Sequence, residues 1–417
     1  MNTSSNSNKP IFVSTFLSHS STDKTLVETV AERLSRRGVL AWLDKNELAM
    51  GALDAALKQA VQRQTTITIF LSKASLASSW CRDELLWAIE AQEDCEHLLP
   101  VYLGNPLELV RAHDLLRTRF LHPDGDRVNQ NGFFCNSDPT NPNPDAIAEE
   151  IAKTVYQRSI PKLWSEIAIV LDQRGNGQRR GEPSLPANFA NLQLPILTFR
   201  PDLGLRQQGE VLTGKDWKDM VQTMISSLAC ALGTMRGDLR KVRVLGEAQT
   251  GLVWALGMYF NRTTDVDLYG YGRDNLPITN RGQVRLTPLE GGDPHRAELL
   301  NESNTNQLKV ALGVGSKEKY AQAVKNAVPD ISLFWIESGS ISDSDQAMKL
   351  VADIVASVLY LRQVYNVNEL VMFWTTANHV ALLAAANLTK HVIHKIQYME
   401  WDRSRMKYVH LPMPDAQ

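Results

Sequence analysis

One pattern occurs twice in the second half of the chain and constrains its fold more than any other feature. Residues 241–257 have the pattern of an apolar strand, a short polar turn and a helix rich in small residues, and residues 369–385 repeat it. A further apolar segment follows each copy, at 266–269 and 395–398. A duplication of this kind predicts two Rossmann-like α/β halves side by side.

The first part of the chain alternates apolar strands with amphipathic helices. Such alternation predicts a parallel, doubly wound, flavodoxin-like sheet. The expected strands are 11–17, 39–44, 66–71 and 98–103, and the expected helices are 25–37, 53–62, one beginning at 80, and 145–156.

Composition shifts divide the 417 residues into segments. We expect a disordered tail at 1–10, a first α/β domain at 11–157 and a linker at 158–163, where Pro161 discourages continuation of the preceding helix. The second domain spans 164–417, with pseudo-repeats at about 164–300 and 306–417.

The charge balance and the cysteines narrow the function classes. The chain has 44 Lys and Arg against 46 Asp and Glu, which argues against broad binding to DNA. The four cysteines have no metal-site or disulfide spacing, so we expect no metal and a reduced, cytoplasmic protein. No apolar run reaches the length of about 20 residues that spans a bilayer, so we expect no membrane partner.

Glu84 is the candidate catalytic residue of the first domain. Ser79 is a good N-cap for the helix that carries Glu84, and the spacing places Cys81 on the buried stripe of that helix. Glu84 itself lies one turn after Trp80 and one turn before Trp87. Taken alone, this window favours a solvated helix glutamate.

Three segments together resemble the signature boxes of a TIR domain. They are Phe16–Asp23, the loop Leu48–Gly51 and Trp80–Leu85, in the family's order, within about the first 155 residues. TIR domains are either adaptors that assemble or enzymes that cleave NAD+, and the enzymes carry a glutamate in the third box. The resemblance therefore implies an NAD+ glycohydrolase with Glu84 as the catalytic carboxylate.

The chemistry of NAD+ makes one carboxylate sufficient. Nicotinamide is a cationic leaving group that departs neutral, so no general acid has to protonate it, whereas ordinary glycosidases need a second carboxylate for that purpose. The remaining task is to stabilise the positive charge that grows on the ribose. NAD+ is then a substrate, and no cofactor is expected.

Several further residues are candidate substrate contacts. Ser18 lies where this fold class binds phosphate or ribose. The aromatic residues are either ring-stacking groups or core, with core slightly favoured for Trp42. The first two residues of the 44–51 loop belong to a segment that reaches a neighbouring copy in TIR assemblies. The candidates are Phe16, Ser18, Trp42, Asp44, Lys45, Trp80 and Cys81.

The two repeated turns of the second domain are candidate phosphate cradles. Unsatisfied backbone N–H groups point outward where a strand and a polar turn lead into a helix, and two such turns suit a cyclic oligonucleotide. Trp374 is either a base-stacking group or core. The candidate contacts are Arg174, Arg200, Gly246, Gln249, Thr250, Lys317, Trp374, Thr375, Thr376 and Asn378.

The second domain resembles a SAVED domain, which is itself similar to two fused CARF units. With a TIR domain in front, the chain resembles the TIR–SAVED effectors of CBASS antiviral systems. That resemblance implies NAD+ depletion switched on by a cyclic oligoadenylate, with cyclic tri-adenylate expected, and self-association into head-to-tail oligomers or filaments. The alternatives are a non-catalytic TIR scaffold and a nucleotide-binding regulator with an inactive TIR domain.

Overall fold

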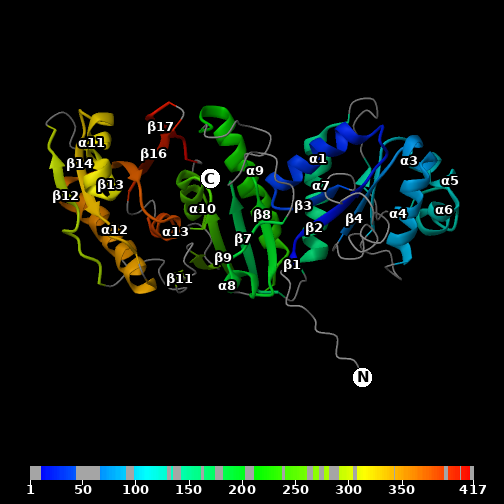
Figure 1. Cartoon of the computed structure of the whole chain (residues 1–417), viewed down its shortest axis with the longest axis horizontal. Coiled ribbons are helices and arrows are strands. Elements are labelled where there is room, and N and C mark those ends of the chain that lie inside the picture. Colours follow the sequence, from blue (N-terminus) through cyan, green and yellow to red (C-terminus); the bar gives the residue numbers. More distant parts are fainter. Residues whose placement is uncertain are drawn as a thin grey trace, which may run out of the picture.

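The computed structural model describes most of the chain. It covers residues 11–43, 66–90, 98–128, 133–134, 142–160, 164–173, 182–201, 211–236, 240–260, 266–271, 277–280, 291–303, 308–341, 343–388, 393–403 and 405–413. Three sheets lie in a row along the long axis of the molecule (Figure 1). The predicted helix at 53–62 lies outside the described residues.

The N-terminal sheet is parallel and has the order β3-β2-β4-β5-β6. Helices α1 and α7 cover one face, and the short helices α3, α5 and α6 together with α4 lie on the other. The elements are β2 (Ser14–Ser18), α1 (Lys24–Arg36), β3 (Leu40–Leu43), β4 (Thr66–Leu71), α3 (Lys73–Ala77), α4 (Ser79–Glu90), β5 (Leu98–Tyr102), α5 (Pro106–Arg111), α6 (Asp114–Phe120), β6 (Phe133–Phe134) and α7 (Pro144–Ser159).

The two remaining sheets have the same topology, which confirms the duplication. Their parallel cores run β8-β7-β9-β10 and β14-β13-β15-β16, and each ends in an antiparallel strand, β11 or β17. The strands of the first half are β7 (Glu166–Asp172), β8 (Pro195–Phe199), β9 (Arg240–Glu247), β10 (Val266–Tyr271) and β11 (Pro277–Asn280); those of the second are β12 (Glu298–Asn301), β13 (Lys309–Gly315), β14 (Ser332–Glu337), β15 (Glu369–Trp374), β16 (Lys395–Asp402) and β17 (Lys407–Leu411).

Equivalent helices also follow equivalent strands in the two halves. In the first half these are α8 (Ala187–Ala190), α9 (Gly214–Gly233) and α10 (Thr250–Phe260); in the second they are α11 (Lys317–Ala327), α12 (Ser344–Tyr365) and α13 (Asn378–Asn387). Helix α11 was not predicted, because only Val324 of its residues is buried and its apolar stripe is thin.

Helices α10 and α13, the repeated small-residue helices, join the two halves. The two helices approach each other closely at Gly257, where an added Cβ would lie 2.3 Å from the carbonyl oxygen of Leu382 and 2.8 Å from Cβ of Ala385. Gly257 and Ala385 hold equivalent positions in the two copies of the repeat. The small side chains therefore let the two helix backbones touch across the pseudo-symmetric interface.

The predicted strand at 11–17 is wrong in one respect, because it is two strands in two different sheets. Strand β1 (Ile11–Phe12) pairs in parallel with β8 of the second domain, whereas β2 belongs to the N-terminal sheet. Val13 lies between them: its N–H donates to the carbonyl of Ile196 at 2.9 Å, and its own carbonyl accepts from the N–H of Leu40 at 3.0 Å. One residue thus joins the two sheets.

Beyond its pairing with β1, the outer edge of β8 makes further backbone hydrogen bonds to the N-terminal domain. The N–H of Thr198 donates to the carbonyl of Gly38 at 3.0 Å, and the N–H of Arg200 donates to that of Ser35 at 2.9 Å. Unpaired strand edges favour aggregation, so these bonds protect the sheet. The contact between the domains is therefore a backbone ladder and extends far beyond the linker.

The close approach of α10 and α13 predicts a position-specific cost of adding one methyl group. Gly257→Ala should lower the free energy of unfolding by about 1–3 kcal/mol, because the Cβ overlaps a rigid backbone carbonyl. Gly233→Ala, at the end of α9, is the matched control: nothing lies within 4 Å of its added Cβ, so it should be neutral or slightly stabilising. Chemical denaturation of the full chain measures both. Equal effects of the two substitutions would contradict the packing argument.

Candidate functional site

Glu84 lies on α4, the helix that follows the end of β4. Ser72 caps the short helix α3 through a capping box with Ser75, and α4 begins at Ser79 directly afterwards. Parallel α/β sheets gather their functional groups at the carboxyl ends of the strands. The local sequence therefore places Glu84 near the carboxyl ends of the strands, where active sites form in this fold class.

The Glu84 carboxylate is buried, with 1% of the residue exposed. Its Oε2 accepts a hydrogen bond from Oγ of Ser18, which is the last residue of β2 and is equally buried. Glutamate is rarely buried without partners, because removing a charge from water is costly. The interpretation of Glu84 as a solvated helix residue is therefore wrong, whereas Asp83, the next residue back, is exposed.

The structure brings Phe16 and Trp42 to the same face of the sheet as Ser18. Phe16 and Trp42 are register partners on β2 and β3, and Ser18 is two residues beyond Phe16 on the same strand. Phe16 is 1% exposed and belongs to the hydrophobic core, whereas Trp42 is half-buried at its margin. Of the two aromatic candidates, Trp42 has the exposed surface that a ligand needs.

Cys81 is buried one turn before Glu84, as the helix spacing predicted. Asp44 and Lys45 lie outside the described residues, and the same holds for the side chain of Trp80. No group of three or more His, Cys, Asp or Glu in the described part of the chain could hold a metal ion. Nor is any described helix long and apolar enough to cross a membrane.

In the second domain the two repeated turns contact each other. Thr250 Oγ1 lies 2.9 Å from Oδ1 of Asn378, which holds the equivalent position in the second copy. The side-chain Nδ2 of Asn378 donates to the backbone carbonyls of Gly246 and Ala248 at 3.0 and 2.8 Å. The sequence-predicted residues from the two halves therefore form one cluster on the pseudo-symmetric interface.

The first turn differs from the predicted open cradle, because protein groups accept its amide protons. The N–H of Gln249 donates to the side chain of Gln173 at 2.7 Å, and the N–H of Gly251 donates to the carboxylate of Glu400 at 2.9 Å. Sequence reasoning missed Gln173 and Glu400, since neither lies in a motif and Glu400 comes from a strand about 150 residues away.

The other candidate residues are divided between the core and the surface. The Arg200 side chain is buried and forms an ion pair with Asp172, with Nε 3.1 Å from Oδ2. Lys317 is exposed, and its Nζ lies 2.7 Å from the Glu298 carboxylate. Thr375 Oγ1 donates to the carbonyl of Val314 at 3.1 Å, Thr376 is half-buried, and Arg174 lies outside the described residues.

Trp374 combines core packing with a polar atom that has no bonding partner. The residue is 6% exposed, and its ring centroid lies 5.4 Å from that of Trp254. Its indole N–H has no hydrogen-bond partner among the described residues. Buried N–H groups are usually paired, so this buried donor without a described partner is exceptional.

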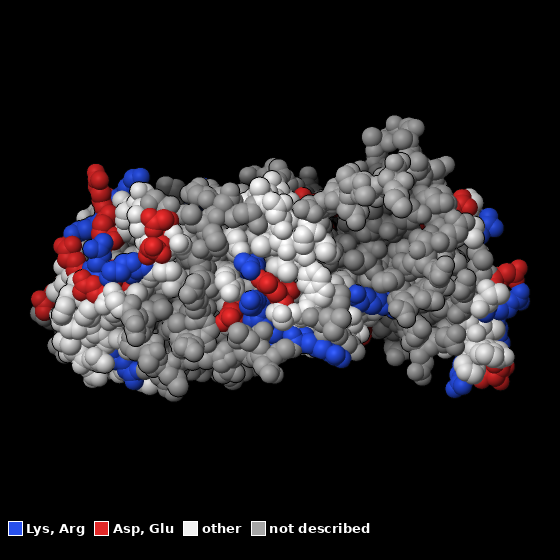
Figure 2. Space-filling model, turned by 90° about the horizontal axis from the view of Figure 1, so that it is seen from below, with Lys and Arg blue, Asp and Glu red and all other residues white. Residues whose placement is uncertain are grey.

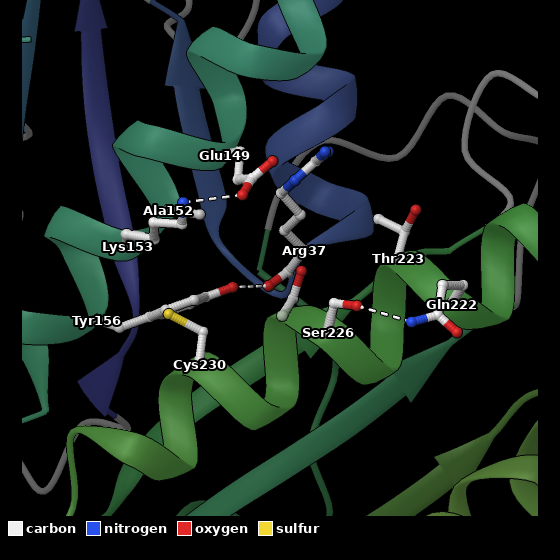
Figure 3. Close-up of a pocket in the computed structure, with 10 residues that line it drawn as sticks. Arg37, Glu149, Ala152, Lys153, Tyr156, Gln222, Thr223, Ser226 and Cys230 are labelled. Atoms are coloured by element: carbon white, nitrogen blue, oxygen red, sulfur yellow. Dashed lines mark hydrogen bonds and ion pairs between the residues drawn. The ribbon is translucent and has the colours of Figure 1, made fainter. Parts of the chain in front are cut away.

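A polar pocket of about 260 Å³ lies between α7 of the first domain and α9 of the second (Figure 3). Lys153 pairs with Glu149 and Glu150, and hydrogen bonds from Lys153 to Glu149 and then Glu150 raise the pKa of the lysine. Burial raises the pKa of the Cys230 thiol on the opposite wall, which favours its protonated form.

Charges of both signs lie next to each other on the face seen in Figure 2. At the end of the molecule formed by β12, β14 and α11, described Lys and Arg side chains lie beside Asp and Glu. Helix α11 and strand β12 are themselves joined by the ion pair of Lys317 with Glu298, at 2.7 Å. The near-neutral composition is therefore also locally balanced there.

Comparison with known proteins gives a family match for one part of the chain. Over most of its length the chain is similar to Cap4 SAVED/CARF-domain containing receptors. The receptor of Acinetobacter baumannii with the cyclic trinucleotide 3'3'3'-cAAA is 12% identical, with 86% of this chain and 85% of that one covered and a TM-score of 0.44. The receptor of Moraxella osloensis is 13% identical, with 86% and 84% covered and a TM-score of 0.41.

No curated protein matches the chain. Residues 15–130 match the TIR domain family. This range begins within β2 and includes Ser18, Glu84 and the strands up to β5. The N-terminal α/β domain that carries the buried carboxylate is therefore a TIR domain.

Proposed function

We propose that the protein is an NAD+ glycohydrolase switched on by a cyclic oligonucleotide. The observation that carries this proposal is the burial of Glu84 against Ser18 in a TIR domain. A desolvated carboxylate stabilises positive charge far better than one in water. It would stabilise the oxocarbenium ion that forms as neutral nicotinamide leaves, and water would then capture the ribose.

Glu84→Gln should abolish NAD+ cleavage and leave the fold intact. The amide keeps the shape of the side chain and removes the charge, so the rate should fall at least about 100-fold. Asp83→Asn makes the same chemical change one residue away on the exposed side and should behave as the parent. Nicotinamide release, measured by chromatography with saturating activator, gives the rates. Near-parental turnover by a folded Glu84→Gln protein would contradict the catalytic role, and a parent with no turnover would favour a TIR scaffold.

The proposed activator site lies where the two halves of the second domain meet. The proposal rests on the duplication within this chain, rather than on the distant likeness to the Cap4 receptors. Two turns at equivalent positions and in contact bring polar groups from both halves to one place, which suits a ligand with repeated chemistry such as a cyclic oligonucleotide. The Trp374 N–H is an unused donor next to the second turn. Phosphate binding at the α10 N-terminus would displace Glu400, whose carboxylate occupies one of its amides.

Trp374→Phe should weaken binding of cyclic tri-adenylate roughly five- to tenfold, the loss of one hydrogen bond. Trp254→Phe is a matched control, since Trp254 packs against Trp374, has the same unpaired indole nitrogen and is fully buried. Trp254→Phe should destabilise the core to a similar degree but leave the affinity for cyclic tri-adenylate unchanged. Calorimetry of the full chain with cyclic di-, tri- and tetra-adenylate measures binding. Equal affinities for the two variants would remove Trp374 from the site, and no binding in the panel would remove the sensor function.

The backbone ladder gives the two proposed sites a physical connection. The Arg200 side chain pairs with Asp172 at the carboxyl ends of β7 and β8, while its N–H bonds to the TIR domain at Ser35. Strand β1 pairs with β8, and the same chain continues through β2 to Ser18. A ligand that moves β8 would therefore move the hydrogen-bond partner of Glu84.

We propose further that activation proceeds through head-to-tail assembly. The two halves are not identical, so a contact between one copy's first half and the next copy's second half does not close on itself unless the rotation permits. At saturating cyclic tri-adenylate, NAD+ cleavage should rise more steeply than in proportion to protein concentration. Light scattering with and without the nucleotide measures the assembly. An active species that stays monomeric would contradict this mechanism.

A further inference from the structure

One carboxylate ties together two loops next to the Glu84 site. Asp23 Oδ2 accepts a hydrogen bond from Oγ of Ser20 at 2.6 Å and another from Oγ of Ser72 at 2.7 Å. Ser20 lies two residues beyond the end of β2, and Ser72 directly follows β4. Both serines are buried, so their hydroxyl groups depend on protein partners.

The Asp23 side chain does not cap its own helix, which is the usual role of an aspartate at this position. Asp23 is the N-cap of α1, where an aspartate normally accepts a hydrogen bond from an amide of its own first turn. Its backbone is helical instead (φ −89°, ψ −2°), and its side chain makes no capping hydrogen bond. The carboxylate instead contacts a residue 49 positions along the chain. Its geometry serves the two loops rather than the end of the helix.

Both loops lead directly to the Ser18–Glu84 contact. On one side, Ser18 is two residues before Ser20. On the other, Ser72 Oγ accepts from the N–H of Ser75 at 3.0 Å and so fixes the start of α3. Ser78 then links α3 to α4, because its carbonyl accepts from the N–H of Arg82 at 3.2 Å. Hydrogen bonds therefore connect Asp23 to both partners of the contact.

We propose that Asp23 is a positioning residue of the Glu84 site. It holds the end of β2 and the α3–α4 unit at the separation at which Ser18 meets the carboxylate, and it acts through Ser20 and Ser72. This inference rests on the proposed function, because the separation matters for catalysis only if Glu84 acts on NAD+. A displacement of about 1 Å in such a site costs up to about 100-fold in rate.

Kinetics of the full chain at saturating cyclic tri-adenylate test the inference. Asp23→Asn should lower kcat for NAD+ cleavage about 10- to 100-fold, with cyclic tri-adenylate affinity unchanged. Asp83→Asn is the matched control and should keep the parental kcat. Asp23→Asn combined with Ser72→Ala should lower kcat by less than the product of the two single effects, because both changes act on the same hydrogen bond. A residue with a merely structural role would lower the melting temperature and leave kcat at the parental value.

Hydrogen exchange gives a readout that needs no NAD+. Amides at 19–22 and 73–75 should exchange faster in Asp23→Asn than in the parent, and at the parental rate in Asp83→Asn. Parental kcat in folded Asp23→Asn protein overturns the inference. If Asp23→Asn does not fold, parental kcat in both Ser20→Ala and Ser72→Ala overturns it instead. A parent that cleaves no NAD+ refutes the proposed function alone; exchange then decides whether Asp23 holds the loops, and unchanged rates refute that too.

Discussion

The backbone of Val13 serves two sheets at once, and the arrangement of the molecule depends on it. Its N–H belongs to the ladder with β8 and its carbonyl to the ladder of the TIR sheet. The peptide groups on either side of Val13 are planar and rigid. The two sheets that they join therefore meet at a nearly fixed point. Further backbone hydrogen bonds, from Thr198 in β8 to Gly38 and from Arg200 just after β8 to Ser35, fix the angle between the two sheets. The orientation of the TIR domain is thus set by backbone hydrogen bonds.

The polar groups of the molecule divide between two strategies. At the TIR site, buried polar groups converge on a few carboxylates: Glu84 accepts from Ser18, and Asp23 accepts from Ser20 and Ser72. At the pseudo-symmetric interface, each turn satisfies groups of the other through Thr250 and Asn378. In both places a polar network specifies geometry that apolar packing alone would leave open. The apolar cores around them supply the bulk of the stability.

The fold was largely predictable because strong periodic patterns dominate it. The duplication, the parallel sheets and the helix of Glu84 follow from apolar strands and from helices with repeated small residues. The split between β1 and β2 was not predictable, since Ile11 to Leu17 is one nearly continuous apolar run and nothing in it marks where the chain changes sheets. Such an apolar run predicts that the strand is buried, but it does not predict which strand pairs with it.

The candidate sites were predictable to a lesser degree, for a physical reason. A motif places Ser18 and Glu84 at strand ends, but long-range partners decide what each group does. Glu400 reaches the turn before α10 from a distant strand, and Asp23 leaves its own helix for Ser72. The ligands and assembly of the protein stay predictions, because they depend on molecules beyond this chain.

The position of β1 has a consequence for how the protein is made. Strand β1 pairs with β8, which is synthesised only after the whole TIR domain. The TIR sheet can form during synthesis, since it needs only strands that precede residue 160, but Ile11 and Phe12 must wait without their partner. Domains generally fold as units as they emerge, and non-local strand pairing is slow. The pairing of β1 with β8 therefore follows formation of the TIR sheet, and this pairing joins the two domains.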